Sequence, residues 1–157
     1  MGPTDMDDKV KYCPPTAPAS KVQSFCIQGN WGLNKDLIPK MVGMFARAAN
    51  CQRIAGVKDG MSNTFLAGEL VPTHCNWHNA FGHNFPMSAT SIPLGRLDLS
   101  ISSAYSDSCG FKSFHPGGAN FLMGDGRVQF VKNSINYQTY NALGSSRMGE
   151  VISADAL

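Results

Sequence analysis

The chain has 157 residues, and its 13 Lys and Arg nearly balance its 11 Asp and Glu, which leaves a formal net charge of +2 at pH 7. This length suits one domain with its own core, and charges scattered along the chain argue against nucleic acid as a partner. No apolar run approaches the roughly 20 residues that a membrane-spanning helix needs, so no membrane span is expected in this chain.

The first half of the chain predicts a few short extended elements. Residues 1–20 combine Asp, Lys and Pro without the apolar middle region of a signal peptide, so we expect a mobile segment there and a single globular domain over 21–157. Loose alternation predicts a strand over 22–31. Residues 41–49 stay open between a short helix and an extended piece, because a glycine interrupts them. The apolar run over 63–71 is typical of a strand.

A long loop is predicted over residues 74–103, where His, Asn, Pro, Gly and Ser dominate. Such loops are uncommon in compact domains and often carry function. We therefore place a candidate ligand surface on its aromatic residues Trp77, Phe81 and Phe85.

Residues 119–123 and 127–131 flank Gly124-Asp125-Gly126, which predicts an antiparallel hairpin. In the second arm, Val128 and Phe130 alternate with polar residues, the pattern of a strand with one buried face. The nearby glycines at 117, 118, 124 and 126 are predicted to need positive φ.

After the hairpin, Ser134 is the expected N-cap of a short amphipathic helix over 135–143, with Gly144 as its stop. A sheet with long loops and short helices predicts the α+β class.

The most informative segment is 111–126, in which nine residues separate His115 from Asp125-Gly126. It resembles the His-x9-Asp-Gly segment of a large bacterial family of prepilin-type proteins, domain-of-unknown-function family 1559, which is grouped with the pilin-like proteins. Further motifs of that family occur here in its order: Cys13-Pro14; Asn30-Trp31-Gly32; Asp59, Gly60, Ser62, Asn63, Thr64, Gly68 and Glu69; His115, Pro116, Gly117, Gly118, Asn120, Asp125 and Gly126; and Gly149, Glu150 and Val151.

The resemblance implies a pilin-like antiparallel sheet and a non-enzymatic pilin-like or pseudopilin-like subunit, related to type II secretion or type IV pilus systems. Its expected place is extracytoplasmic, in the cell envelope or periplasm, with other pilin-like or secretion-system subunits as partners. The family's prepilin leader and long N-terminal helix do not occur in this chain. Either the chain is a truncated piece of a protein that this helix anchors in the inner membrane, or this member has lost its anchor. The alternative is an extracytoplasmic module that binds a glycan or small solute through the 74–103 loop.

Five cysteines are each separated by more than ten residues, which excludes Cys-x2-Cys zinc sites. In the extracytoplasmic setting that the resemblance implies, Cys75 and Cys109 are the disulfide candidates, because they bracket the segment between the two main motifs. The other reading, buried free thiols, stays open.

Three further kinds of site, for a metal, for a catalytic serine and for calcium, have weaker support in the sequence. His74, His78 and His83 are the best metal candidates, but loop histidines are more often solvated, so no metal or other cofactor is predicted. Ser113 near His115 suggests a nucleophile without the context of one. Asp107 and Asp125 are too few for calcium.

The obvious reading of the signature, a contact between His115 and Asp125, conflicts with the predicted hairpin. Residues 119–123 alone extend roughly 13 Å at about 3.3 Å per residue. We predict that His115 orders the base of the hairpin while Asp125-Gly126 forms its turn.

Overall fold

The computed structural model describes residues 43–45, 53–76, 88–90, 92–98, 100, 108–147 and 149–152. The expected mobile segment at 1–20, the strand over 22–31 and most of 41–49 lie outside these residues. Within the described ranges, no helix has the length and apolar character needed to cross a bilayer.

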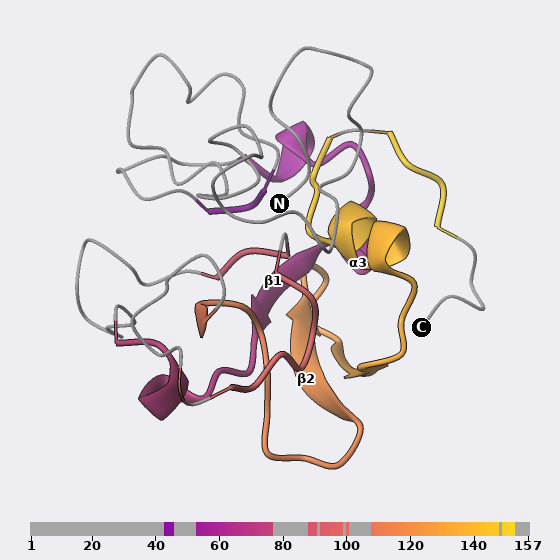
Figure 1. Cartoon of the computed structure of the whole chain (residues 1–157). Helices are drawn as coiled ribbons and strands as arrows, with labels where there is room; N and C mark the ends of the chain where they lie inside the picture. Colours follow the sequence, from indigo (N-terminus) through magenta and orange to yellow (C-terminus); the bar gives the residue numbers. More distant parts are fainter. Residues whose placement is uncertain are drawn as a thin grey trace, which may run out of the picture.

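The described part is built on a three-stranded antiparallel sheet in the order β1-β2-β3 (Figure 1). The strands are β1 (Phe65–Gly68), β2 (Gly118–Met123) and β3 (Val128–Lys132). The helix α3 (Tyr137–Leu143) follows, and the 3₁₀ helices are η2 (Ile54–Gly56), η3 (Met61–Asn63) and η4 (Pro72–His74). One small sheet and short helices are compatible with the α+β class.

The strand predicted over 63–71 is shorter at both ends. At the start, Asn63 belongs to η3 and not to the strand. After the end of the strand, Pro72 begins η4, since proline has no N–H to continue the hydrogen-bonded ladder. Glu69 still pairs beyond the strand, because its amide donates to the Asn120 carbonyl at 3.1 Å.

The predicted hairpin is confirmed, with each boundary shifted by no more than one residue. Its turn is closed by a hydrogen bond from the Gly126 amide to the Met123 carbonyl at 3.0 Å, and the Met123 amide bonds the Arg127 carbonyl at 2.8 Å. Only Gly126 in this turn has a positive φ, at 91°. A three-residue loop that ends in a left-handed glycine is a common hairpin connection.

The alternation in β3 is real, but the expected buried face is wrong. Ala119 pairs with Val131 and Phe121 with Gln129, so the apolar side of β2 shares a face with the odd residues of β3. Val128 and Phe130 therefore lie on the opposite face, 65% and 41% exposed.

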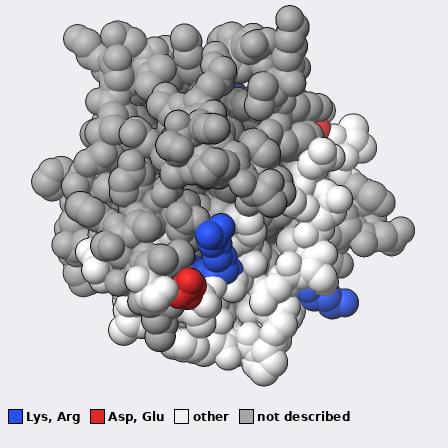
Figure 2. All heavy atoms as spheres, viewed as in Figure 1, with Lys and Arg blue, Asp and Glu red and all other residues white. Residues whose placement is uncertain are grey.

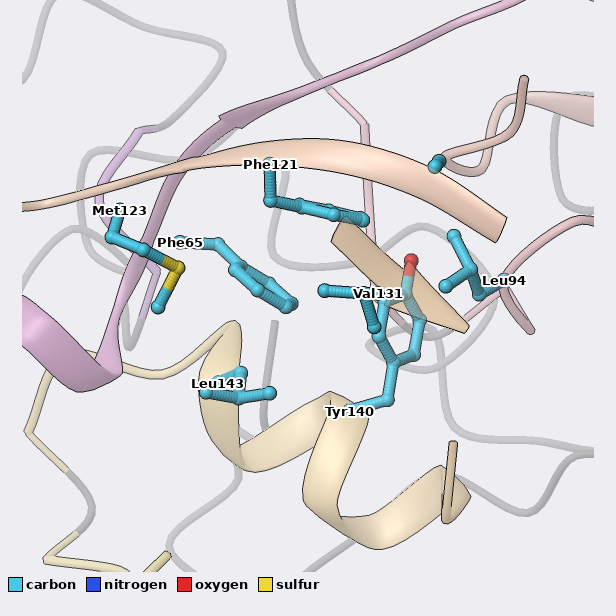
Figure 3. Close-up of a cluster of buried hydrophobic side chains, with 8 residues drawn as sticks. Phe65, Leu94, Phe121, Met123, Val131, Tyr140 and Leu143 are labelled. Carbon is cyan, nitrogen blue, oxygen red and sulfur yellow. The ribbon is translucent and has the colours of Figure 1, made fainter. Parts of the chain in front are cut away.

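The core lies between this sheet and α3 (Figure 3). Phe65 of β1 stacks on Phe121 of β2 with ring centroids 4.1 Å apart, and Tyr140 of α3 meets both rings at 6.0 and 6.2 Å. Leu143 is also fully buried. Full burial of one such side chain contributes about 1.5–3 kcal/mol, so a handful of aromatic and aliphatic residues holds α3 on the sheet.

The start of α3 corrects the predicted cap. Asn136, and not Ser134, is the N-cap, because its Oδ1 accepts the amides of Gln138 at 2.9 Å and Thr139 at 3.2 Å. Ile135 lies outside the helix but still packs against the core. Both residues are of the cap-forming type, and the helix begins after the one whose side chain accepts the first free amides.

Candidate functional site

The motif residues Glu69, His115 and Asn120 meet at the base of the hairpin. Glu69 Oε2 accepts the Asn120 amide at 2.7 Å, and Glu69 Oε1 lies 3.2 Å from His115 Nε2. The hydrogen bond from the Asn120 amide is the main reason that the pKa of Glu69 lies below its usual value. Two motifs that are 46 residues apart in the chain are thus joined through one carboxylate.

His115 and Asp125 have separate partners, as the hairpin predicts. The imidazole of His115 bonds Glu69, whereas Asp125 Oδ1 accepts the Arg127 amide at 2.9 Å inside the turn. His115 therefore makes its contact at the base of the hairpin, and Asp125 makes its contact in the turn at the other end.

Ser113 is not placed as a nucleophile activated by His115. Its Oγ accepts the backbone amide of His115 at 3.0 Å, while the imidazole bonds Glu69. An activated serine needs its hydroxyl on the ring nitrogen of the base.

The segment Asp59–Thr64 is hydrogen-bonded to the hairpin turn. The Gly124 amide donates to the Thr64 carbonyl at 2.8 Å, and the Asp125 amide donates to the Met61 carbonyl at 3.1 Å. Arg127 Nη2 adds a bond to the Ser62 carbonyl at 3.2 Å. The segment itself is closed by side chains, since Thr64 Oγ1 donates to Gly60 O at 3.0 Å and Asn63 Nδ2 to Asp59 O at 3.4 Å.

The glycines of the ribbon serve two different purposes. Gly117 and Gly126 have the predicted positive φ, at 80° and 91°. Gly118 and Gly124 do not, and the prediction is wrong there. A Cβ on Gly124 would lie 2.8 Å from the Met61 carbonyl, and one on Gly118 would collide with the Val131 carbonyl. These two positions need a close backbone approach.

Asp59 joins the first motif to the tail. Its Oδ2 lies 2.7 Å from Ser145 Oγ, and its Oδ1 accepts the Gly149 amide at 2.7 Å. The same Ser145 hydroxyl lies 3.1 Å from Glu150 Oε2. Asp59 and Gly149, which is at φ 75°, are 90 residues apart in the chain, and this carboxylate connects them.

A second group of polar side chains is buried beside a disulfide. Cys75 and Cys109 are joined, with their Cα atoms 5.2 Å apart, which is the pair that the sequence suggested. His74 and Lys112 flank this bond at 0% and 1% exposure, with Lys112 Nζ 2.6 Å from His74 Nδ1. Nζ also donates to the Ser108 carbonyl.

The expectation that His74 is a solvated loop residue is therefore wrong. It ends η4, whose turn directs the ring inward, and its Nε2 lies 2.5 Å from the Asp98 carbonyl oxygen and 3.0 Å from the Asp98 amide. Burial lowers the pKa of His74, and the neighbouring Lys112 lowers it further. Burial also lowers the pKa of Lys112 to about 8, with a smaller effect from Arg96.

Several of the predicted site residues lie outside the part of the chain that the structure describes. The metal candidates His78 and His83, the aromatic residues Trp77, Phe81 and Phe85, and Asp107 all fall outside the described residues. Across the described ranges, no three His, Cys, Asp or Glu side chains gather closely enough to hold a metal ion.

Three partners of these groups were missed from the sequence. Nothing in the pattern distinguished Ser145 as the hydroxyl shared by Asp59 and Glu150. Lys112 stands among Phe and Ser residues shortly after Cys109, and nothing in this pattern indicates that its side chain is buried. Asp98 takes part through its backbone, which no side-chain pattern reveals.

The family model described as "Protein of unknown function (DUF1559)" matches residues 33–138. The chain belongs to this family. The match includes the Asp-Gly-Met-Ser-Asn-Thr segment and the His-x9-Asp-Gly ribbon, the two motifs that meet around the hairpin. No characterised protein and no solved structure matches the chain.

Proposed function

We propose that this protein is a non-enzymatic, pilin-like subunit of the bacterial cell envelope, which acts by contact with other subunits of a secretion or pilus type system. The observation that carries the proposal is the exposed apolar face of the hairpin. Leu122, Val128 and Phe130 share this face, and Val128 and Phe130 are 65% and 41% exposed. Large apolar side chains side by side on a surface are typical of protein contacts.

The chemistry of the motif residues supports the same reading. Glu69 and Asp59 each use one carboxylate oxygen to accept a backbone amide, of Asn120 and Gly149, and the other to bond a side chain, of His115 and Ser145. Groups used in this way hold the ribbon and tail in place, which is a structural role. Few Lys, Arg, Asp or Glu side chains mark the described part of the face in Figure 2, a surface better suited to protein than to nucleic acid.

The alternative, an extracytoplasmic module for a glycan or small solute, has one observation in its favour. The loop between Cys75 and Cys109 is closed by the disulfide, and Asp98 ties it to His74, so it is anchored at its base and at Asp98. An anchored loop loses less entropy when it binds a ligand.

Affinity purification from the native cells separates the two functions. We compare the natural chain with a variant that carries Val128→Glu and Phe130→Glu, and with Gln138→Glu as the control, since Gln138 is exposed on α3. The assembly function predicts envelope subunits with the natural chain and the control, and their loss from the double variant. Identical partners in all three samples, or no protein partner in any, would contradict it.

A further inference from the structure

The amine of Lys112 is an unusual group to find inside this protein. Its side chain is 1% exposed, and its hydrogen bonds go to the imidazole of His74 and the carbonyl of Ser108. Neither partner carries a full negative charge. Arg96, also a cation, acts on it through space and disfavours its charged form. A buried ammonium with neutral partners is held at a cost in free energy, so something else must keep it in place.

The disulfide is next to both partners of the amine. His74 precedes Cys75, and Ser108 precedes Cys109, so the crosslink fixes the two groups that Lys112 contacts. Further along the closed loop, the Gly95 amide donates to the Phe111 carbonyl at 3.1 Å, beside Lys112. The covalent bond therefore closes the loop whose described residues Gly95 and Asp98 bond Phe111, next to Lys112, and His74.

The hydrogen bonds of His74 fit this arrangement. When Lys112 is an ammonium it donates to Nδ1, and Nε2 then carries the ring hydrogen and donates to the Asp98 carbonyl. When Lys112 is neutral it accepts from Nδ1, and Nε2 accepts the Asp98 amide at 3.0 Å. Burial favours the neutral amine, which is the nucleophilic form. The imidazole can therefore accept a hydrogen bond from the ammonium form of Lys112 or donate one to its neutral form.

We propose that the Cys75–Cys109 disulfide is a redox latch over Lys112, and that its reduction by a dithiol exposes this amine as a modification site for an acyl electrophile. In the first step one thiolate of the dithiol attacks a sulfur of the disulfide and its second thiol completes the exchange. The protein gains two electrons and two protons as two thiols, and the dithiol leaves oxidised. In the second step Lys112 Nζ attacks the acyl carbon, an amide forms, the leaving group departs, and the proton of the amine passes to His74 or water.

Labelling of the intact chain with an N-hydroxysuccinimide ester of acetate, read by peptide mass spectrometry, tests the proposal. Lys132 of β3 is exposed and serves as the internal reference. In the oxidised protein we expect Lys112 to react at least about tenfold more slowly than Lys132, because reaction there requires local opening. After treatment with dithiothreitol the two rates should come within about threefold of each other.

A variant with Cys75→Ala and Cys109→Ala isolates this bond from Cys13, Cys26 and Cys51, and it should label like the reduced protein. His74→Gln keeps the latch and should leave Lys112 slow in the oxidised protein. The proposal is overturned if Lys112 stays slow after reduction, or if it is already as fast as Lys132 before it. It is also overturned if amide exchange shows that the β2 amides lose protection together with Lys112, since the release would then be global unfolding.

Discussion

Replacement of Glu69 tests whether the motif residues hold the ribbon in place. In Glu69→Ala the Asn120 amide loses an acceptor at 2.7 Å, and His115 loses its partner at 3.2 Å. A part-buried amide left without its acceptor costs about 1–3 kcal/mol. The exposed pair with His115 adds no more than about 1 kcal/mol. We therefore expect the free energy of unfolding to fall by roughly 1–4 kcal/mol in Glu69→Ala.

Two matched variants separate these contributions. Glu69→Gln keeps an oxygen for the Asn120 amide and should lose about 1 kcal/mol, because only the charge of the acceptor is removed. His115→Gln keeps the Asn120 bond and should lose less than about 1 kcal/mol. Urea unfolding at pH 7 followed by circular dichroism gives all three values. The reasoning fails if Glu69→Ala is as stable as the natural chain, or if His115→Gln costs as much as Glu69→Ala.

The same carboxylate predicts a pH dependence. The pKa of Glu69 is lowered in the folded protein from a reference value of 4.5, so its stabilisation is complete above that pH and is lost as pH falls through the lower folded pKa. The difference between the natural chain and Glu69→Gln should therefore shrink in acid. A difference that is constant from pH 7 to pH 3 would contradict this.

Three further predictions concern the buried pair, the crosslink and the turn. The pKa of Lys112 falls from 10.5 to about 8 on folding, so the folded state binds fewer protons than the unfolded state between these values. The free energy of unfolding should therefore rise by about 1–3 kcal/mol from pH 8 to pH 10. Denaturant midpoints should show this rise for the natural chain and not for Lys112→Met. Loss of the Cys75–Cys109 crosslink, which spans 34 residues, should cost about 4 kcal/mol by loop closure, and an unchanged melting temperature in the double Ala variant would contradict it. Gly126→Val should lower the free energy of unfolding by more than about 1 kcal/mol, because φ is 91° at this position. Asp125→Asn should change it by less than about 0.5 kcal/mol. Equal melting temperatures for the two variants would refute the turn geometry.

The hairpin could be predicted because its determinants are local. Asp125 and Gly126 specify a turn over a few residues, and the apolar arms on each side specify strands. The same local reasoning placed His115 away from Asp125, and the structure bears this out. Local patterns did not reveal that Val128 faces outward, since the face of a strand is decided by the neighbour it pairs with.

The long-range partners could not be predicted for a physical reason. Glu69 and His115 are 46 residues apart, and the distance along the chain carries no information on which carboxylate reaches which amide. His74 is the clearest example, because a histidine in a polar stretch is usually solvated. Its burial follows from the crosslink at Cys75 and from Lys112, 38 residues away.

The exposed face of the hairpin is the proposed contact with another envelope subunit. The most direct measurement places a photo-crosslinking amino acid at Val128 in the native cells, with Gln138 on α3 as the matched site. We predict adducts with a pilin-like or secretion-system subunit from Val128 and not from Gln138. Absence of protein adducts from Val128, or the same adducts from both positions, would contradict it.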